Sequence, residues 1–173
     1  YPRTERLEAL LRHLAGRPSD IALPLAYWKS GTLPPPGRGH HPARDGCGLL
    51  WYAPLVPLKP AAVRSYVQLV ERICPPHGME PLITLTSLSE RCFDSTLPLL
   101  FDRASVDDAA RAHACQRELL AAGREAGFLP YRLGVHSMKE WIDPDLPCWR
   151  FSSALKQAID PHGILAPGRY GRA

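Results

Sequence analysis

Apolar side chains recur at helical spacing in several parts of the chain. In the first of these, the leucines from Leu7 to Leu14 follow the i, i+3, i+4, i+7 pattern of an amphipathic helix. In a later, alanine-rich stretch, Ser105 is an N-cap residue, and the acids that follow it suit the positive end of a helix dipole. We predict helices over residues 3–16, 19–28, 60–74 and 105–126, and a last helix that follows Pro147.

Shorter apolar or alternating runs predict strands between these helices. The runs cover residues 49–56, 82–88, 95–101 and 128–135. Pro98 lies within the third run, which places that run on a sheet edge or at a bulge. From residue 49 onward the order is strand, helix, strand, strand, helix, strand. Because this is the order of a ferredoxin-like α+β unit, we predict an antiparallel sheet with both helices on one face.

Prolines and glycines divide the chain into three parts. Residues 30–48 break every period and contain Pro34-Pro35-Pro36, which predicts a long loop of the kind that is either disordered or functional. We therefore expect N-terminal helices and a loop over 1–48, a core over 49–150, and a C-terminal helix and strap over 151–173. The strap has two proline turns around the apolar pair Ile164 and Leu165, which predicts a segment that docks at a fixed place.

Composition excludes several classes of function. The 22% charged and 45% hydrophobic residues are typical of a soluble globular protein, and no apolar run approaches the roughly 20 residues that span a bilayer. The net charge of +4 is spread along the chain, so no basic stripe predicts nucleic-acid binding. Five cysteines without a Cys-x-x-Cys pair predict reduced, mostly buried thiols in a cytoplasmic protein, and no metal site. Since an initial Met and an apolar leader are both missing, we expect the chain to begin partway through a longer protein.

Four blocks of sequence, taken together, resemble the FAD-linked oxidases of the vanillyl-alcohol oxidase and p-cresol methylhydroxylase type. The resemblance is specific as a set, whereas each block alone would be weak. The blocks are Arg44-Asp45-Gly46-Cys47-Gly48-Leu49-Leu50-Trp51, Thr84-Leu85-Thr86, Gly127-Phe128-Leu129-Pro130-Tyr131-Arg132 and Asp160-Pro161-His162-Gly163-Ile164-Leu165-Ala166-Pro167-Gly168-Arg169.

The resemblance implies a two-domain enzyme in which a cap domain covers an FAD-binding domain. This chain is similar to the C-terminal part of the cap, with a strap that returns to an upstream FAD-binding domain that the chain lacks. It implies FAD as cofactor and oxidation of a para-substituted phenol by hydride transfer to the flavin. The fragment alone is expected to be inactive. A homodimer, a cytochrome c electron acceptor and, with that acceptor, a periplasmic location are left open.

Tyr131 and Arg132 resemble the family's catalytic pair, which binds the phenolic oxygen and holds it as phenolate. A cation and a hydroxyl donor stabilise an oxyanion, so they would lower the pKa of the phenol. The alternative is structural: neighbouring strand residues point to opposite faces, which would make Tyr131 a core residue and Arg132 a solvated one.

The resemblance also implies roles for three residues outside the catalytic pair. By resemblance, Trp51 and Thr84 line the substrate pocket, and Arg169 lies near the flavin and the substrate. The structural alternatives are a core aromatic residue, a surface threonine and an exposed tail residue.

Non-covalent FAD is the expectation, although members of the family often tether the cofactor through a His or Tyr of the cap. Leu49 occupies the position of the attached histidine, and His41 lies close to that of the attached tyrosine. Imidazole can form such a link, so His41 is the one candidate, against the alternative of a solvated loop histidine. Arg91-Cys92-Phe93-Asp94 stands where some members carry histidines, which leaves the para substituent of the substrate open.

Two other functions are left open. A flavin oxidoreductase of the same superfamily could act on a hydroxy acid or a sugar. A non-enzymatic ferredoxin-like module could serve binding or oligomerisation, because a fold alone does not specify a function.

Overall fold

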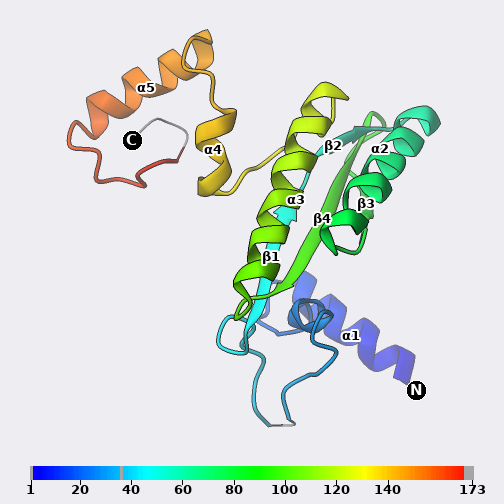
Figure 1. The fold of residues 1–173 in the computed structure, drawn as a ribbon. Helices are drawn as coiled ribbons and strands as arrows, with labels where there is room; N and C mark the ends of the chain where they lie inside the picture. The colour runs from blue at the N-terminus through cyan, green and yellow to red at the C-terminus, as the bar shows by residue number, and fades with distance from the viewer. Residues whose placement is uncertain (1, 36, 170–173) are drawn as a thin grey trace.

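An antiparallel sheet covered on one face by two helices forms the centre of this α+β molecule (Figure 1). The computed structural model describes residues 2–35 and 37–169. The helices are α1 Pro2–Leu14, α2 Pro60–Ile73, α3 Val106–Glu125, α4 Val135–Trp141 and α5 Pro147–Ile159, with short 3-10 helices η1 Leu23–Tyr27 and η2 Pro75–His77. The strands are β1 Cys47–Tyr52, β2 Leu55–Pro57, β3 Thr84–Ser87 and β4 Cys92–Asp102.

The longest strand, β4, is the centre of the sheet. β1 and β2 pair with one edge of β4 in a single register, and β3 pairs with the other edge. The predicted strand over 49–56 is therefore two short strands, which are separated at Ala53 and Pro54. The predicted helices over 60–74 and 105–126 are confirmed as α2 and α3.

The predicted strand over 128–135 is largely wrong. Only a bridge between Pro130 and Pro54 forms there, where the N–H of Leu55 donates to the carbonyl of Leu129 at 2.9 Å and the N–H of Tyr131 donates to that of Ala53 at 3.1 Å. The missing N–H of Pro130 would point away from Pro54, because the two prolines are a non-hydrogen-bonded pair between those two bonds. The chain then turns into α4 within the stretch that was expected to be a loop after residue 135.

Pro98 lies in the central strand at a place where that strand has a free side. The N–H of Ser95 donates to the carbonyl of Pro54 at 3.0 Å, and hydrogen-bonded pairs alternate along an antiparallel ladder. Trp51 and Pro98 are then a non-hydrogen-bonded pair, so the missing N–H of Pro98 faces the β3 side. Since the ladder with β3 ends at Thr96, the proline removes no bond from either ladder. The prediction that this run lies on a sheet edge or at a bulge is therefore wrong, because β4 is paired on both sides and only the stretch at Pro98 lacks a β3 partner.

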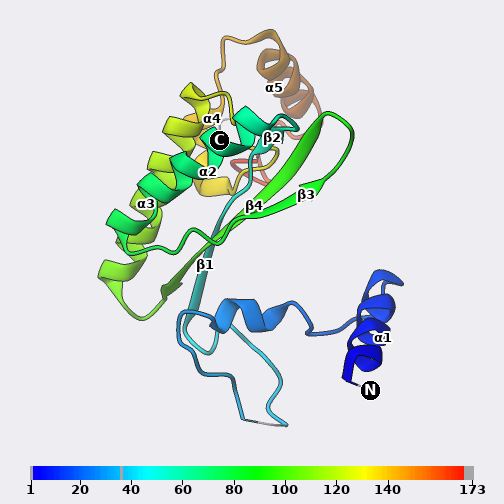
Figure 2. The ribbon, with the colours of Figure 1, turned by 90° about the vertical axis from the view of Figure 1, so that its right-hand side faces the viewer.

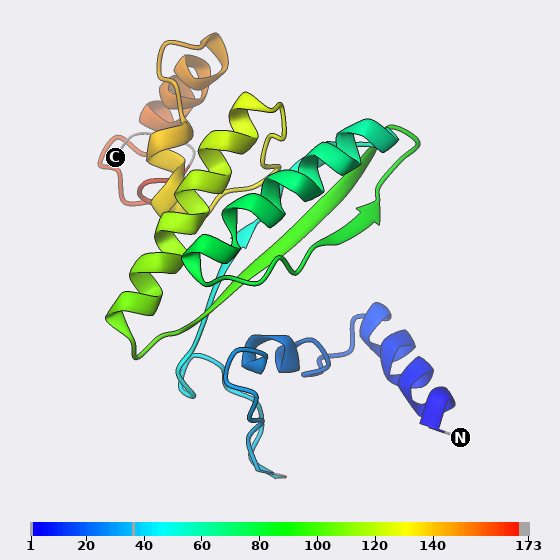
Figure 3. The same cartoon turned by 45° about the vertical axis from the view of Figure 1, so that its right-hand side comes forward.

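One hydrophobic core lies between the sheet and the helices α2 and α3, so the prediction that both helices cover one face is confirmed (Figure 3). Alternate residues of β4, Leu97, Leu99 and Phe101, point into it. Its other buried members are Tyr52, Val56, Tyr66, Leu69, Val70, Ile73, Cys74, Met79, Ala112, Cys115, Leu119, Leu120 and Phe128.

The N-terminal segment lies on the other side of the sheet, near the start of β1 (Figure 2). There η1 contributes the buried Tyr27, whereas the leucines of α1 remain exposed. At the C-terminus, the helix α5 leaves Phe151, Leu155 and Ile159 exposed. In the described residues, no helix is long and apolar enough to cross a membrane.

Candidate functional site

The sheet face opposite α2 and α3, called here the open face, gathers several of the residues selected from the sequence. Directly paired residues of an antiparallel ladder share a face, and so do residues two apart on one strand. Because Trp51 pairs with Pro98, and Thr84 pairs with Thr96, all four belong to the open face. The open face is made by Leu49, Trp51, Ala53, Leu55, Thr84, Thr86, Asp94, Thr96, Pro98 and Leu100.

Tyr131 and Arg132 meet at the edge of the open face. The backbone bridge places Tyr131 opposite Ala53, and its side chain is 37% exposed. The Nη2 atom of Arg132 donates a hydrogen bond to the Tyr131 hydroxyl at 2.9 Å, and the guanidinium carbon lies 5.0 Å from the centre of the Tyr131 ring. Residues 131–133 are not in a strand, so neighbouring side chains need not diverge. A cation and a phenol hydroxyl therefore converge on one spot.

Trp51 and Thr84 lie on the same sheet face as Tyr131. Trp51 is 47% exposed, which makes it a surface aromatic residue rather than part of the core. Thr84 is also exposed, and three strand spacings, about 14 Å in all, separate its backbone from that of Tyr131. An aromatic ring, two hydroxyl-bearing positions and a cation thus share one face of the sheet.

A series of hydrogen bonds from α3 and α4 holds the backbone carbonyl of Trp51. The Nε2 atom of Gln116 in α3 donates to the Trp51 carbonyl at 2.8 Å, and Gln116 Oε1 lies 2.8 Å from Nε2 of His136 in α4. An amide oxygen only accepts, so the Nε2 of His136 carries the proton. Burial lowers the pKa of His136, and the neighbouring His113 lowers it further, which favours the neutral ring. The sequence offered no signal for these contacts, because Gln116 is 65 positions from Trp51.

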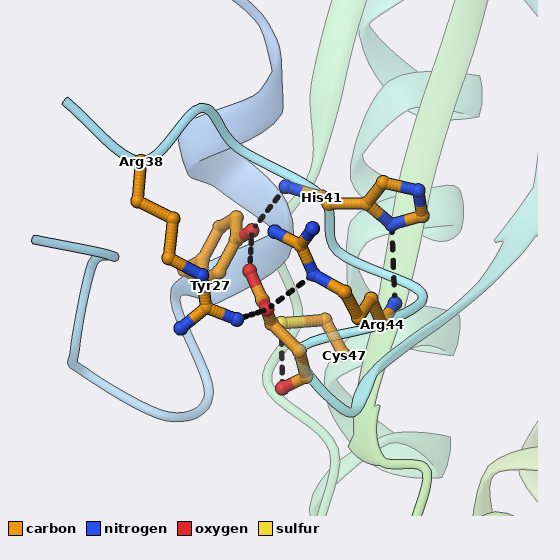
Figure 4. A network of polar contacts seen from close by, with 6 residues as sticks. Tyr27, Arg38, His41, Arg44 and Cys47 are labelled. Atoms are coloured by element: carbon orange, nitrogen blue, oxygen red, sulfur yellow. Dashed lines mark hydrogen bonds and ion pairs between the residues drawn. The ribbon is translucent and has the colours of Figure 1, made fainter.

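His41 is held in a different network, at the Cys47 end of β1 (Figure 4). The backbone N–H of His41 donates to the Tyr27 hydroxyl at 2.8 Å, and its Nδ1 accepts from the N–H of Arg44 at 3.2 Å. Along the strand, roughly 20 Å separates this end from Ala53. The structure therefore does not bring His41 together with Tyr131.

Asp45 is the centre of that network. Its carboxylate accepts from the Tyr27 hydroxyl at 2.7 Å, and it pairs with Arg38 at 2.7 Å and Arg44 at 3.5 Å. The hydrogen bond from Tyr27, together with the two cations, holds the pKa of Asp45 below its usual value. Burial and the hydrogen bond to Asp45 raise the pKa of Tyr27. Sequence reasoning missed this loop anchor, because its members lie 18 positions apart without a periodic pattern.

The tail that carries Arg169 is organised by a buried carboxylate. Asp160 accepts from Lys156 Nζ at 2.8 Å and from the backbone N–H groups of Ile164 at 2.9 Å and Leu165 at 2.8 Å. Ile164 and Leu165 are nevertheless 77% and 56% exposed, so the described residues do not cover the apolar pair that was expected to dock. The side chain of Arg169 makes no hydrogen bond or ion pair with any described residue. The end of the expected strap, residues 170–173, lies outside the described residues.

Comparison with known proteins gives relatives for most of this chain. It is 35% identical over 155 residues to 1'-carboxy-chondrochloren decarboxylase of Chondromyces crocatus, which covers 90% of this chain and 28% of that protein. It is 28% identical over 129 residues to the flavoprotein subunit of 4-cresol dehydrogenase (hydroxylating) of Pseudomonas putida, which covers 74% of this chain and 25% of that subunit. No family model matches.

Two solved structures share the fold. A substrate-bound p-cresol methylhydroxylase covers 72% of this chain with a TM-score of 0.63 and 25% identity. The 4-ethylphenol oxidase of Gulosibacter chungangensis, in complex with isoeugenol, covers 73% with a TM-score of 0.65 and 25% identity. This chain spans 24% and 25% of those two chains, and so about a quarter of the length of its relatives.

Proposed function

The chain belongs to the vanillyl-alcohol oxidase and p-cresol methylhydroxylase family of flavin oxidoreductases, and from this we propose that it is the substrate-binding cap portion of an FAD-dependent enzyme that oxidises a para-substituted phenol. The observation that carries the proposal is the convergence of Tyr131 and Arg132, 2.9 Å apart, at the edge of the open face. The two relatives named for cresol and ethylphenol chemistry support the phenolic substrate.

In the proposed reaction, Tyr131 and Arg132 bind the phenolic oxygen of the substrate. The guanidinium and the hydroxyl both donate to that oxygen, so they stabilise its anion and lower the pKa of the phenol. The phenolate then releases electron density towards the para carbon, which eases loss of hydride from the benzylic position. Bound FAD supplies the acceptor for that hydride.

The described residues fit the substrate side of a flavin site. Trp51, Leu129 and Tyr131 are 47%, 53% and 37% exposed at one sheet edge, which is the kind of apolar and aromatic surface that a planar ring covers. We propose that an upstream FAD-binding domain covers this surface and that the strap over 151–173 returns to that domain. Leu49 has no group for a covalent link, and His41 lies in the separate Asp45 network, which favours non-covalent FAD.

We further propose that the core over 49–150 is a ferredoxin-like unit with a shortened last strand. Across the sheet, residues 129–131 lie next to β1 and β2, these two strands lie next to β4, and β3 lies on the other side of β4. This order supports the ferredoxin-like prediction, with the N-terminal part over 1–48 as a separate cover for the start of β1.

Kinetics of the full-length flavoprotein test the proposed role of Arg132. We expect Arg132→Ala to lower kcat/KM for 4-ethylphenol by about 100-fold to 1,000-fold, because a charged donor to the developing anion is lost. We expect Tyr131→Phe to have a smaller effect of the same sign. Arg64→Ala is the matched control, because Arg64 is a solvent-exposed arginine of α2, on the other side of the sheet, and it should leave kcat/KM unchanged. An Arg132→Ala enzyme with wild-type constants would refute the proposal.

A second candidate is oxidative decarboxylation of a phenol whose side chain carries a carboxylate. The observation that favours it is the 35% identity to a protein named as a decarboxylase. Release of carbon dioxide from 4-hydroxyphenylacetate by the full-length enzyme would test it.

A further inference from the structure

Asp94 is an acidic residue in the middle of the open face. It lies on β4, where it pairs with Leu55 of β2 on one side and with Thr86 of β3 on the other. It therefore points to the same side as Thr96 and Trp51, away from the hydrophobic core. Neither the fold nor the proposed catalytic pair requires a carboxylate at this position.

The carboxylate of Asp94 has a buried oxygen without a partner. Among the described residues, Asp94 Oδ1 is one of two buried side-chain oxygen atoms that make no hydrogen bond. Other shielded carboxylates of this chain are well satisfied: Asp108 accepts from Arg111 and a backbone N–H, and Asp160 accepts from Lys156 and two N–H groups. A buried acceptor without a donor destabilises the folded chain, so such a group calls for an explanation.

The rest of the carboxylate is available to a ligand. Asp94 is half-buried as a residue, and its other oxygen, Oδ2, is neither buried nor hydrogen-bonded to a described residue. Partial removal from water strengthens the hydrogen bond that this oxygen can accept. The accessible side of Asp94 is thus a strong acceptor that faces the same space as the aromatic residues.

The distance between Asp94 and Tyr131 allows the two residues to bind opposite ends of one substrate. Two strand spacings and two residues along the strand separate the two backbones, which is about 12 Å. Between them, on the same face, lie Ala53 and Leu55, so an apolar floor connects the two positions. A phenol whose oxygen is bound by Tyr131 can extend its para side chain across this floor towards Asp94.

We propose that Asp94 determines specificity for the para side chain by accepting a hydrogen bond from a hydroxyl or ammonium group on it. The inference rests on the proposed function, since Tyr131 and Arg132 fix the opposite end of the substrate. An acceptor at this place favours a donor and repels a carboxylate. It therefore also predicts that the enzyme discriminates against phenols with a carboxylated side chain.

Three phenols with a two-carbon para side chain test the assignment in the full-length flavoprotein: 4-ethylphenol, 4-(2-hydroxyethyl)phenol and 4-hydroxyphenylacetate. We expect the wild type to prefer the hydroxyethyl compound over the ethyl compound, in both Kd and kcat/KM. Asp94→Leu should reduce that preference roughly tenfold to a hundredfold, the range for a hydrogen bond to a charged group. Asp94→Asn should improve binding of the carboxylated compound. Glu90→Gln, at a solvent-exposed acid next to the same strand, is the control and should change none of these values.

Thermal unfolding supplies a readout that does not depend on turnover. Without ligand, Asp94→Leu should raise Tm by roughly 2–6 °C, because it removes an unsatisfied buried acceptor. An Asp94→Leu protein with lower Tm and an unchanged preference would overturn the assignment, and so would a wild type that prefers the carboxylated phenol. If the wild type binds and oxidises none of the three phenols, the proposed function itself falls.

Discussion

At the scale of single residues, side-chain contacts differ from what the local sequence pattern alone predicts. Tyr131 and Arg132 could be picked from a short motif, but strand alternation predicted that they diverge. They converge because residues 131–133 leave the sheet, and the guanidinium can then bend back onto the Tyr131 ring. The partnerless oxygen of Asp94 had no signature in the sequence, because an acid in a strand is normally read as solvent-facing.

Gly123 and Tyr52 form another contact that only the structure reveals. A Cβ atom on Gly123 would lie 2.0 Å from the Tyr52 hydroxyl, whose oxygen is buried without a partner. Burial raises the pKa of Tyr52, which keeps the hydroxyl neutral. The glycine in the last turn of α3 therefore makes room for a core phenol ring.

Replacing this glycine tests that contact. Gly123→Ala should destabilise the protein by about 1–3 kcal/mol, because the overpacking cost exceeds the gain of about 1 kcal/mol in helix propensity. Tyr52→Phe removes the hydroxyl and should restore stability when combined with Gly123→Ala. Urea unfolding of the two single variants and the double variant measures this coupling. If Gly123→Ala lowers the free energy of unfolding equally in the wild type and in the Tyr52→Phe variant, the contact does not exist as described.

At the scale of elements, the patterns predicted α1, α2, α3 and α5, but they missed α4 and predicted a helix over 19–28 where only the 3-10 helix Leu23–Tyr27 forms. The helices over 60–74 and 105–126 follow from apolar spacing and caps that do not depend on the rest of the fold. The strand over 128–135 was largely wrong because hydrophobicity indicated pairing, whereas the chain leaves the sheet after Tyr131 and enters α4 at Val135. The C-terminal turn was read correctly from its prolines and glycines, but the buried Asp160 that organises it was not recognised.

Asp160 gives the tail a predictable dependence on pH. The hydrogen bond from Lys156 and those from the two backbone N–H groups lower the pKa of Asp160 below its ordinary value of 3.8. A carboxylate whose pKa is depressed on folding contributes stability above the unfolded pKa, and that stability is lost as pH falls through the folded pKa. The turn should therefore remain intact at neutral pH and loosen only below about pH 4.

The variant Asp160→Asn removes the charge without changing the shape of the side chain. We expect the amides of Ile164 and Leu165 to exchange hydrogen faster in this variant at neutral pH, because the acceptor is weakened. Asp145→Asn, at an exposed acid in the preceding loop, serves as control. Unchanged exchange at both amides in Asp160→Asn would show that the carboxylate does not hold the turn.

At the scale of the whole molecule, the exposed surfaces match a chain that spans about a quarter of the length of its relatives. The core between the sheet and its two helices is buried, whereas Trp51 and Thr84 of the open face, one side of α5 and the apolar pair of the tail are exposed. The sequence could predict the α+β class, because it depends on local pattern, whereas the pocket role of Trp51 and Thr84 stays a prediction. It could not predict the Asp45 network or the support of Trp51 by Gln116, because these join distant segments by single hydrogen bonds.

The central claim, that Tyr131 and Arg132 hold a phenol as its anion, is tested most directly by titrating a bound phenol. The ligand 4-tert-butylphenol has no benzylic hydrogen, so it can occupy the site of the full-length flavoprotein without reacting. A free phenol side chain ionises near pH 10. Ultraviolet difference spectra should show the bound ligand ionising about 1–3 pH units below the free ligand, and Arg132→Ala should abolish most of that difference. A bound phenol that ionises at the same pH as the free one would contradict the account.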